Sequence, residues 1–197
     1  MESFIMVLLV TTSVISVAFL AERSLALRWK RVIPPAVVNA ARGCTSTKEL
    51  PALRQTCELF PSPTSRLLLV AANHLDCPRA ENVDALQTKA RHEVAGLERG
   101  LVVLEIVTGI APLLGLVGTI FGLILLFNSM GADGTAGDQS LFASGIALAL
   151  RATLMGLLVA IPSLIGWNYF NRKVDTLAVE METICDDFLR THYHAER

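Results

Sequence analysis

Charge is scarce in this chain: of its 197 residues, 18% are Asp, Glu, Lys or Arg, whereas 52% are hydrophobic. So apolar a composition excludes an ordinary soluble domain of this size. The formal net charge is −1, and there is no basic stripe, RNA-binding motif or zinc-finger spacing, so nucleic acid is excluded as a partner. The sequence also lacks a nucleophile–base pair, a phosphate-binding loop and a set of metal ligands, so we expect neither an enzyme nor a bound cofactor.

The apolar residues that are present fall into three blocks, with the charged residues between them. The first block runs from Phe4 to Ala21, the second from about Leu101 to Phe127, and the third from about Phe142 to Phe170. Each block is long enough, as a helix, to enter or cross a hydrocarbon core of about 30 Å. We therefore predict an all-α integral membrane protein with three transmembrane helices.

Basic residues predict the orientation of these helices. The segment before the first block contains no lysine or arginine, which argues against a cleavable signal peptide. Four basic residues follow that block between positions 23 and 31, and Arg172 and Lys173 follow the third block, whereas residues 129–141 contain none. The positive-inside rule therefore predicts that the N-terminus lies outside and the C-terminus inside. It also places Cys44, Cys57, Cys77 and Cys185 in the cytoplasm, where reduced thiols are expected.

These cues divide the chain into six segments. They are a first transmembrane helix (1–21), a cytoplasmic helical insertion (22–100), a second transmembrane helix (101–128), a short periplasmic loop (129–141), a third transmembrane helix (142–170) and a cytoplasmic C-terminal helix (171–197). Prolines cut the insertion into short helices. From Val83 to Leu104, and again from Val174 to Phe188, apolar residues recur every three or four positions. We expect these stripes to extend spans two and three into a cytoplasmic bundle, with a docking groove for another protein as the alternative.

Small residues recur within spans two and three. Close approach through small residues stabilises helix pairs in lipid, either within one chain or between subunits. The candidate packing residues are Gly115, Gly118, Gly122, Gly145 and Gly156. Pro112 and Pro162 lie toward the cytoplasmic side of their spans, where a modest kink is tolerated.

Two threonines, Thr119 and Thr153, lie near the middle of spans two and three. Because the two spans run antiparallel, these residues can meet at one depth. A single threonine in a membrane helix usually bonds the carbonyl four residues earlier, which is the expectation for Thr11, Thr12 and Thr108. Two threonines at one depth on glycine-rich helices instead favour a polar layer that can hydrogen-bond an ion, water or a carboxyl group.

Carboxylates are absent from the middle of all three spans. The nearest, Glu105, is about 21 Å along the helix from Thr119. Because a proton path through hydrocarbon normally needs an ionisable relay, the carrier acid of a proton channel would have to come from another chain. Arg151 is the one charge deep in a span. Such a residue is a functional candidate, and snorkelling toward the outer surface is the alternative.

Four stretches of the chain resemble one family. IAPLLGLVGTIFGLI (110–124) and GIALALRATLMGLLVAIPSLIGWNYFNR (145–172) resemble the two signature spans of the MotA/TolQ/ExbB proton-channel family, closest to the TolQ/ExbB branch. PSPTSRLLLVAANH (61–74) and EVAGLERGLVVLE (93–105) resemble the cytoplasmic part of that branch. Thr119 and Thr153 match the threonines of the two span motifs, which implies that they line the ion pathway. Leu148 stands where this branch often has glutamate, and Arg151 follows one turn later, so both are candidates for contact with the pore or a partner.

The resemblance implies a bacterial inner-membrane complex in the lipid bilayer, with a pentamer of this subunit around a dimer of a single-span ExbD/TolR-type partner. The partner's membrane aspartate would carry the proton, and proton flow would do work on a periplasmic or outer-membrane load through a TonB-like or TolA-like protein. Protons are the expected transported ion, with sodium as the other option because threonine oxygens serve either. The alternatives are a non-conducting structural membrane scaffold and a sodium-driven stator-like unit.

Overall fold

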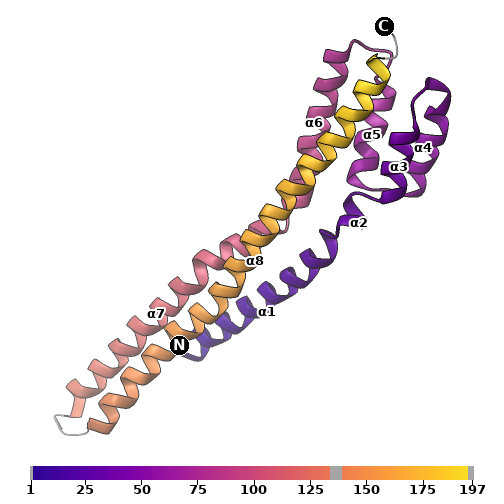
Figure 1. The fold of residues 1–197 in the computed structure, drawn as a ribbon. Helices are drawn as coiled ribbons and strands as arrows, with labels where there is room; N and C mark the ends of the chain where they lie inside the picture. Colours follow the sequence, from indigo (N-terminus) through magenta and orange to yellow (C-terminus); the bar gives the residue numbers. More distant parts are fainter. Residues whose placement is uncertain (1, 134–138, 195–197) are drawn as a thin grey trace. The chain divides into compact units, whose positions relative to one another are not determined.

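The computed structural model describes residues 2–133 and 139–194, which form helices and no strand (Figure 1). The elements are α1 (Glu2–Ala26), α2 (Trp29–Val32), α3 (Pro35–Gly43), the 3₁₀ turn η1 (Thr47–Glu49), α4 (Leu50–Leu59), α5 (Pro63–Asn73), α6 (Arg79–Glu98), α7 (Leu101–Asp133) and α8 (Gln139–His194). Within these described residues, three segments are long and apolar enough to cross a membrane: Phe4–Ala26, Leu101–Asn128 and Gly145–Tyr193. The predicted all-α membrane class is confirmed, and the orientation stays a prediction.

The chain divides into two compact units. The membrane unit comprises Met1–Arg23 and Gly100–Tyr169, and the polar unit comprises Ser24–Arg99 and Phe170–Arg197. The predicted loop at 129–141 is partly helical, because α7 continues to Asp133 and α8 begins at Gln139. Residues 134–138 lie outside the described residues.

In the membrane unit, the backbones of α7 and α8 are in close contact. A Cβ atom built on Gly156 would lie 2.6 Å from the carbonyl oxygen of Ala111 and 3.1 Å from the Cα of Gly115, so neither glycine has room for a side chain. The facing pairs along the two helices are Gly115–Gly156, Gly118–Ala152, Gly122–Ala149 and Leu126–Gly145. Numbers rise along α7 as they fall along α8, so the helices are antiparallel. All five glycines singled out from the sequence lie at this contact.

Helix α1 packs on the same pair of helices. The Ile5 side chain lies against Gly118, and Leu20 lies against Gly166. The Arg23 guanidinium lies against Gly100, where a Cβ atom would overlap it. Elsewhere in the unit, Pro112 and Pro162 lie inside helices that continue on both sides of them.

The helix that leads into the second span is interrupted. Helix α6 ends at Glu98 and α7 begins at Leu101, with a turn at Arg99 and Gly100 between them. The predicted continuous helix from Val83 into the second span is therefore wrong at this point. Glycine is a poor helix former, which fits a turn at Gly100. By contrast, α8 is unbroken over 56 residues, so the third span and the C-terminal segment are one helix.

In the polar unit, prolines mark where helices begin, as predicted for the insertion. Pro35, Pro51 and Pro63 occupy the first turns of α3, α4 and α5, and Pro78 is the N-cap of α6. Proline suits these positions because the first helical N–H groups have no partner within the helix. The predicted stripe on α8 is buried in this unit: it comprises Val174, Leu177, Met181, Ile184 and Phe188.

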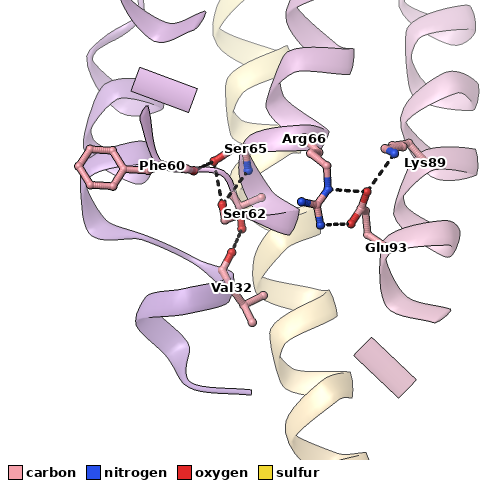
Figure 2. Close-up of polar contacts among 8 residues, drawn as sticks. Val32, Phe60, Ser62, Ser65, Arg66, Lys89 and Glu93 are labelled. Atoms are coloured by element: carbon pink, nitrogen blue, oxygen red, sulfur yellow. Dashed lines mark hydrogen bonds and ion pairs between the residues drawn. The ribbon is translucent and has the colours of Figure 1, made fainter. Parts of the chain in front are cut away.

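Hydroxyl groups hold the start of α5 in place (Figure 2). The Ser62 side chain caps the helix by accepting a hydrogen bond from the Ser65 backbone N–H, at 3.1 Å. The Ser65 hydroxyl donates to the Phe60 carbonyl at 2.6 Å, and the Thr64 hydroxyl donates to the Val32 carbonyl at 2.8 Å. These bonds join α5 to the end of α4 and to the end of α2.

An ion pair joins α5 to α6 in the same unit (Figure 2). Arg66 donates from Nε and Nη2 to the two carboxylate oxygens of Glu93, at 2.9 and 2.5 Å, and Lys89 Nζ lies 3.0 Å from Oε1. The Glu93 side chain is 7% exposed and that of Arg66 is 47% exposed. Burial by itself raises the pKa of Glu93, but the hydrogen bonds and charges of Arg66 and Lys89 outweigh it, so the pKa lies below its usual value.

Glu93→Gln is expected to lower the free energy of unfolding by roughly 1–3 kcal/mol at neutral pH, because it removes charge-assisted hydrogen bonds. Since the pKa of Glu93 is lowered from 4.5 by folding, its contribution is fully present above pH 4.5 and is lost as the pH falls through the folded-state pKa. Denaturant unfolding of the purified protein in detergent from pH 7 to pH 3.5 measures this. The matched control is Glu98→Gln, an exposed glutamate on the same helix. If Glu93→Gln and Glu98→Gln lower the free energy of unfolding equally, the ion pair does not stabilise the fold as expected.

Gly156→Ala is expected to destabilise the membrane unit by about 1–3 kcal/mol, because the added methyl group meets backbone atoms of α7 that have little freedom to move. Gly109→Ala on α7 is the control, since a Cβ atom there has nothing within 4 Å. It should be neutral or slightly stabilising. Thermal unfolding in detergent compares the two variants. A Gly156→Ala protein as stable as Gly109→Ala would contradict the close α7–α8 contact.

Candidate functional site

The side chains of Thr119 on α7 and Thr153 on α8 meet in the membrane unit, where their hydroxyl groups are hydrogen-bonded to each other. Thr119 Oγ1 also lies 3.1 Å from the carbonyl oxygen of Gly115 and 3.2 Å from that of Ala149. Thr153 Oγ1 lies 3.3 Å from the Gly115 carbonyl oxygen. Two hydroxyl groups and two backbone carbonyls therefore form one polar cluster, which we call the threonine pair.

The glycine contact brings the threonine pair together. Gly115 is one turn before Thr119 on α7, and its Cα lies against Gly156 of α8. With no side chain at either position, the backbones approach closely enough for the Gly115 carbonyl to lie within reach of both hydroxyl groups. The glycines that weaken each helix by itself thus position a polar cluster between the two helices.

The two hydroxyl groups of the threonine pair have unused lone pairs that can accept hydrogen bonds, but both of their hydrogens are already used as donors. Each hydroxyl carries one hydrogen and two lone pairs. One hydrogen serves the bond between Thr119 and Thr153, and the other has the Gly115 or Ala149 carbonyl as its acceptor. Three hydroxyl lone pairs remain. Both residues are half-buried, so these lone pairs can accept a hydrogen bond from water or a protonated carboxyl group, or can coordinate a cation.

Other threonines in the membrane unit bond only along their own helices in the contacts found. The Thr108 hydroxyl donates to the Leu104 carbonyl at 2.8 Å, and that of Thr12 donates to the Leu8 carbonyl at 2.7 Å. The expected bond to the carbonyl four residues earlier is confirmed for both. Thr11 differs slightly, since it bonds the carbonyl three residues earlier, at 2.9 Å.

The threonine pair lies far from any carboxylate of its own helices. Neither residues 109–129 nor residues 143–163 contain an aspartate or glutamate. Glu105 is exposed and lies fourteen positions before Thr119 on α7, or about 21 Å along the helix. The two helices therefore present hydroxyl oxygens, without an acid, at this depth.

Arg151 does not join the threonine pair. It is two positions from Thr153, which places it about 200° around α8, on the other side of the helix. Arg151 is exposed, and no ion pair involving it is found among the described residues. Leu148, the other residue considered for contact with the pore or a partner, has a side chain outside the described residues.

A second hydroxyl contact was not predicted from the sequence. Ser16 on α1 and Ser163 on α8 are hydrogen-bonded at 2.6 Å, and their exposed fractions are 3% and 0%. The Ser163 hydroxyl also lies 2.7 Å from the Val159 carbonyl. In the sequence, Ser16 lies in the first apolar block and Ser163 in the third. These positions alone do not show which helices pack together.

Comparison with known proteins agrees with this geometry. The model of the MotA/TolQ/ExbB proton channel family matches residues 61–183, more than half of the chain. The chain belongs to this family. The match includes the threonine pair, the glycine contact between α7 and α8, and the Arg66–Glu93 ion pair.

Several relatives carry the name biopolymer transport protein. ExbB of Aquifex aeolicus is 36% identical over 114 residues, covering 58% of this chain and 76% of the relative. ExbB of Helicobacter pylori strain J99 is 36% identical over 104 residues, covering 53% of this chain and 66% of the relative. ExbB1 of Vibrio cholerae is 28% identical over 176 residues, covering 86% of this chain and 76% of the relative. Together with the three apolar helices, family membership identifies a multi-pass membrane protein.

The hydrogen bond between Ser16 and Ser163 is expected to stabilise the packing of α1 against α8. Ser16→Ala and Ser163→Ala should each lower stability, and a double-mutant cycle should give a coupling of roughly 0.5–1.5 kcal/mol, the range seen for hydrogen bonds between membrane helices. Thermal unfolding in detergent measures it. Ser13→Ala, one turn earlier on α1, replaces Ser16→Ala in the control cycle and should show no coupling. A Ser16–Ser163 coupling near zero would contradict the contact.

Proposed function

We propose that this chain is the ion-channel subunit of a proton-driven motor complex in the bacterial inner membrane. The observation that carries the proposal is the threonine pair: two hydroxyl groups meet within the membrane unit, on helices that have no carboxylate near that depth. Membership of the proton channel family supports the same function. The acid that carries the proton then comes from another chain, a single-span partner of the ExbD/TolR type with an aspartate in its span.

The threonine pair would favour the neutral form of that aspartate. Hydrocarbon disfavours a charged carboxylate, and a hydrogen bond that only the protonated acid can donate raises its pKa further. The spare lone pairs of Thr119 and Thr153 accept such a bond, whereas a carboxylate facing them finds no free hydroxyl hydrogen. The acid would therefore pass the threonine pair protonated and release its proton where water can solvate the charge.

Coupling of proton flow to mechanical work requires more than one chain. We place a pentamer of this subunit around two copies of the partner, so that proton flow moves one component against the other. The work would reach a TonB-like or TolA-like protein and, through it, a load in the periplasm or outer membrane. The names of the relatives, biopolymer transport proteins, support a transport load over other kinds of work.

Two other functions make different predictions about the same residues. A sodium-driven unit would use the spare lone pairs as ligands for a hard cation, for which hydroxyl and carbonyl oxygens are suitable donors. A structural scaffold would use the hydroxyl bond only to hold α7 and α8 together. A threonine variant whose complex assembles but no longer conducts ions would show a role in the ion pathway. A variant whose complex fails to assemble would show a structural role.

Thr119→Val and Thr153→Val are expected to reduce proton flux at least tenfold in liposomes that contain the complex with its partner. Native mass spectrometry should show the complex still assembled. Thr108→Val is the matched control, because Thr108 bonds only its own helix, and it should conduct like the wild type. Full flux in both test variants would overturn the role of the threonine pair. Ion flux that follows a sodium gradient at constant pH would identify sodium, not the proton, as the transported ion. Absence of flux through the wild-type complex would favour the structural scaffold.

A further inference from the structure

The chain leaves its first span through a short basic segment, Arg28–Arg31, which reads RWKR. The residues on both sides of this segment are buried: Leu27 is 0% exposed, and Val32 and Ile33 are each 2% exposed. The four residues of the basic segment are themselves exposed, including Trp29 at 44%. Its buried neighbours therefore fix the basic segment in place while its three positive charges and its indole ring stay accessible.

The charges of the basic segment are not neutralised within the part of the chain that the structure describes. Residues 23–48 contain no aspartate or glutamate, and none of the ion pairs found there involves Arg28, Lys30 or Arg31. Trp29 adds a ring that is apolar apart from one N–H group, a combination that is enriched where hydrocarbon meets water. Such a surface fits a partner that carries negative charge next to an apolar layer.

Chain connectivity brings the basic segment close to a membrane surface. Arg23 on α1 lies against Gly100, directly before the apolar run of α7 begins at Leu101, so the apolar part of the membrane unit ends at this level. Helix α1 ends three residues later at Ala26, about 4.5 Å along the helix, and Arg28 follows after two residues that span at most about 7 Å. The basic segment thus begins within about 12 Å of the hydrocarbon.

That distance is within the range of anionic headgroups. The headgroup layer occupies roughly the first 5–7 Å outside the hydrocarbon on each side of a bilayer. The negative potential of an anionic surface extends about 8 Å beyond the headgroups at physiological ionic strength. Arg28 therefore lies inside this field however the polar unit is oriented, and its side chain can extend farther toward the headgroups.

An acidic side chain from a second copy of the chain is the other candidate for the partner of the basic segment. Exposed acids such as Asp175 are present on α8. A contact between two copies would be needed to bring one of them to the basic segment, whereas connectivity by itself brings the membrane surface there. The observations therefore favour lipid.

We infer that the basic segment binds anionic phospholipid headgroups at the membrane face where α1 ends. Arg28, Lys30 and Arg31 donate hydrogen bonds to phosphate oxygens, and the Trp29 ring lies at the level of the headgroups. Counting Arg23, four basic residues stand within nine positions directly after a span, a density typical of segments that bind anionic lipid. This contact does not depend on ion conduction and would be present in a structural scaffold as well.

Tryptophan fluorescence in nanodiscs tests the contact, because Trp29 and Trp167 are the two tryptophans of the chain. Trp167→Phe leaves Trp29 as the one tryptophan in the full-length protein. Nanodiscs with equal amounts of phosphatidylglycerol and phosphatidylcholine are prepared twice, with bromine on the upper acyl chain of one lipid or the other. Brominated phosphatidylglycerol should quench Trp29 at least about twofold more than brominated phosphatidylcholine, because the basic segment concentrates the anionic lipid around itself.

Charge variants provide the control for this measurement. Changing all three basic residues of the basic segment to glutamine should make quenching by the two lipids equal. The matched control changes Arg42, Lys48 and Arg54 to glutamine, which removes three exposed positive charges elsewhere in the polar unit and should keep the preference.

Equal quenching by the two lipids in the Trp167→Phe protein would overturn the inference. So would a Trp29 that neither lipid quenches. Strong quenching by acrylamide would then place the ring in water, and protection from acrylamide would place it in a protein contact, such as one with a second copy.

If Trp167→Phe fails to fold, native mass spectrometry of the protein with both tryptophans decides the question. The wild type should retain phosphatidylglycerol in preference to phosphatidylcholine. Replacing the three basic residues of the basic segment with glutamine should lower that retention at least about fivefold, the effect expected for one basic residue near an anionic surface. Retention equal to that of the wild type would overturn the inference.

Discussion

The close contact between the backbones of α7 and α8 determines both the helix packing of the membrane unit and the position of its polar groups. At Gly115 and Gly156 the helices are so close that a single methyl group would meet backbone atoms. In lipid this approach contributes packing that leucine against leucine would not, because the surrounding acyl chains are just as apolar. It also lets one carbonyl, that of Gly115, lie near hydroxyl groups from both helices. Packing and polar chemistry therefore depend on the same two glycines.

The polar unit is held together by different forces. Its core contains ordinary apolar side chains such as Leu68, Val174 and Leu177, all at 0% exposure. The helices are then fixed by hydroxyl groups at the start of α5 and by the ion pair of Arg66 with Glu93. If this unit stands in water, as the sequence predicts, hydrophobic burial stabilises it without close-packed glycines.

Much of the fold could be predicted because it depends on local rules. Helical periodicity and the blocks of apolar residues predict the spans, and prolines predict where short helices begin. The meeting of Thr119 and Thr153 follows from two antiparallel helices joined by a short segment. The break at Gly100 could not be predicted in this way, because a glycine by itself does not say where a helix ends: Gly115 and Gly118 lie inside α7 without interrupting it. The bond between Ser16 and Ser163 also requires knowing which sides of α1 and α8 face each other.

The Arg66–Glu93 ion pair has a consequence for a protein that works on protons. Folding lowers the pKa of Glu93, and hydrogen bonding to Glu93 raises that of Arg66 despite the opposing effect of burial. Both groups therefore keep their charges at any pH near neutrality, and the contact between α5 and α6 neither takes up nor releases a proton there. This one contact between α5 and α6 is therefore insensitive to changes near neutral pH in the concentration of the ion that the complex is proposed to conduct.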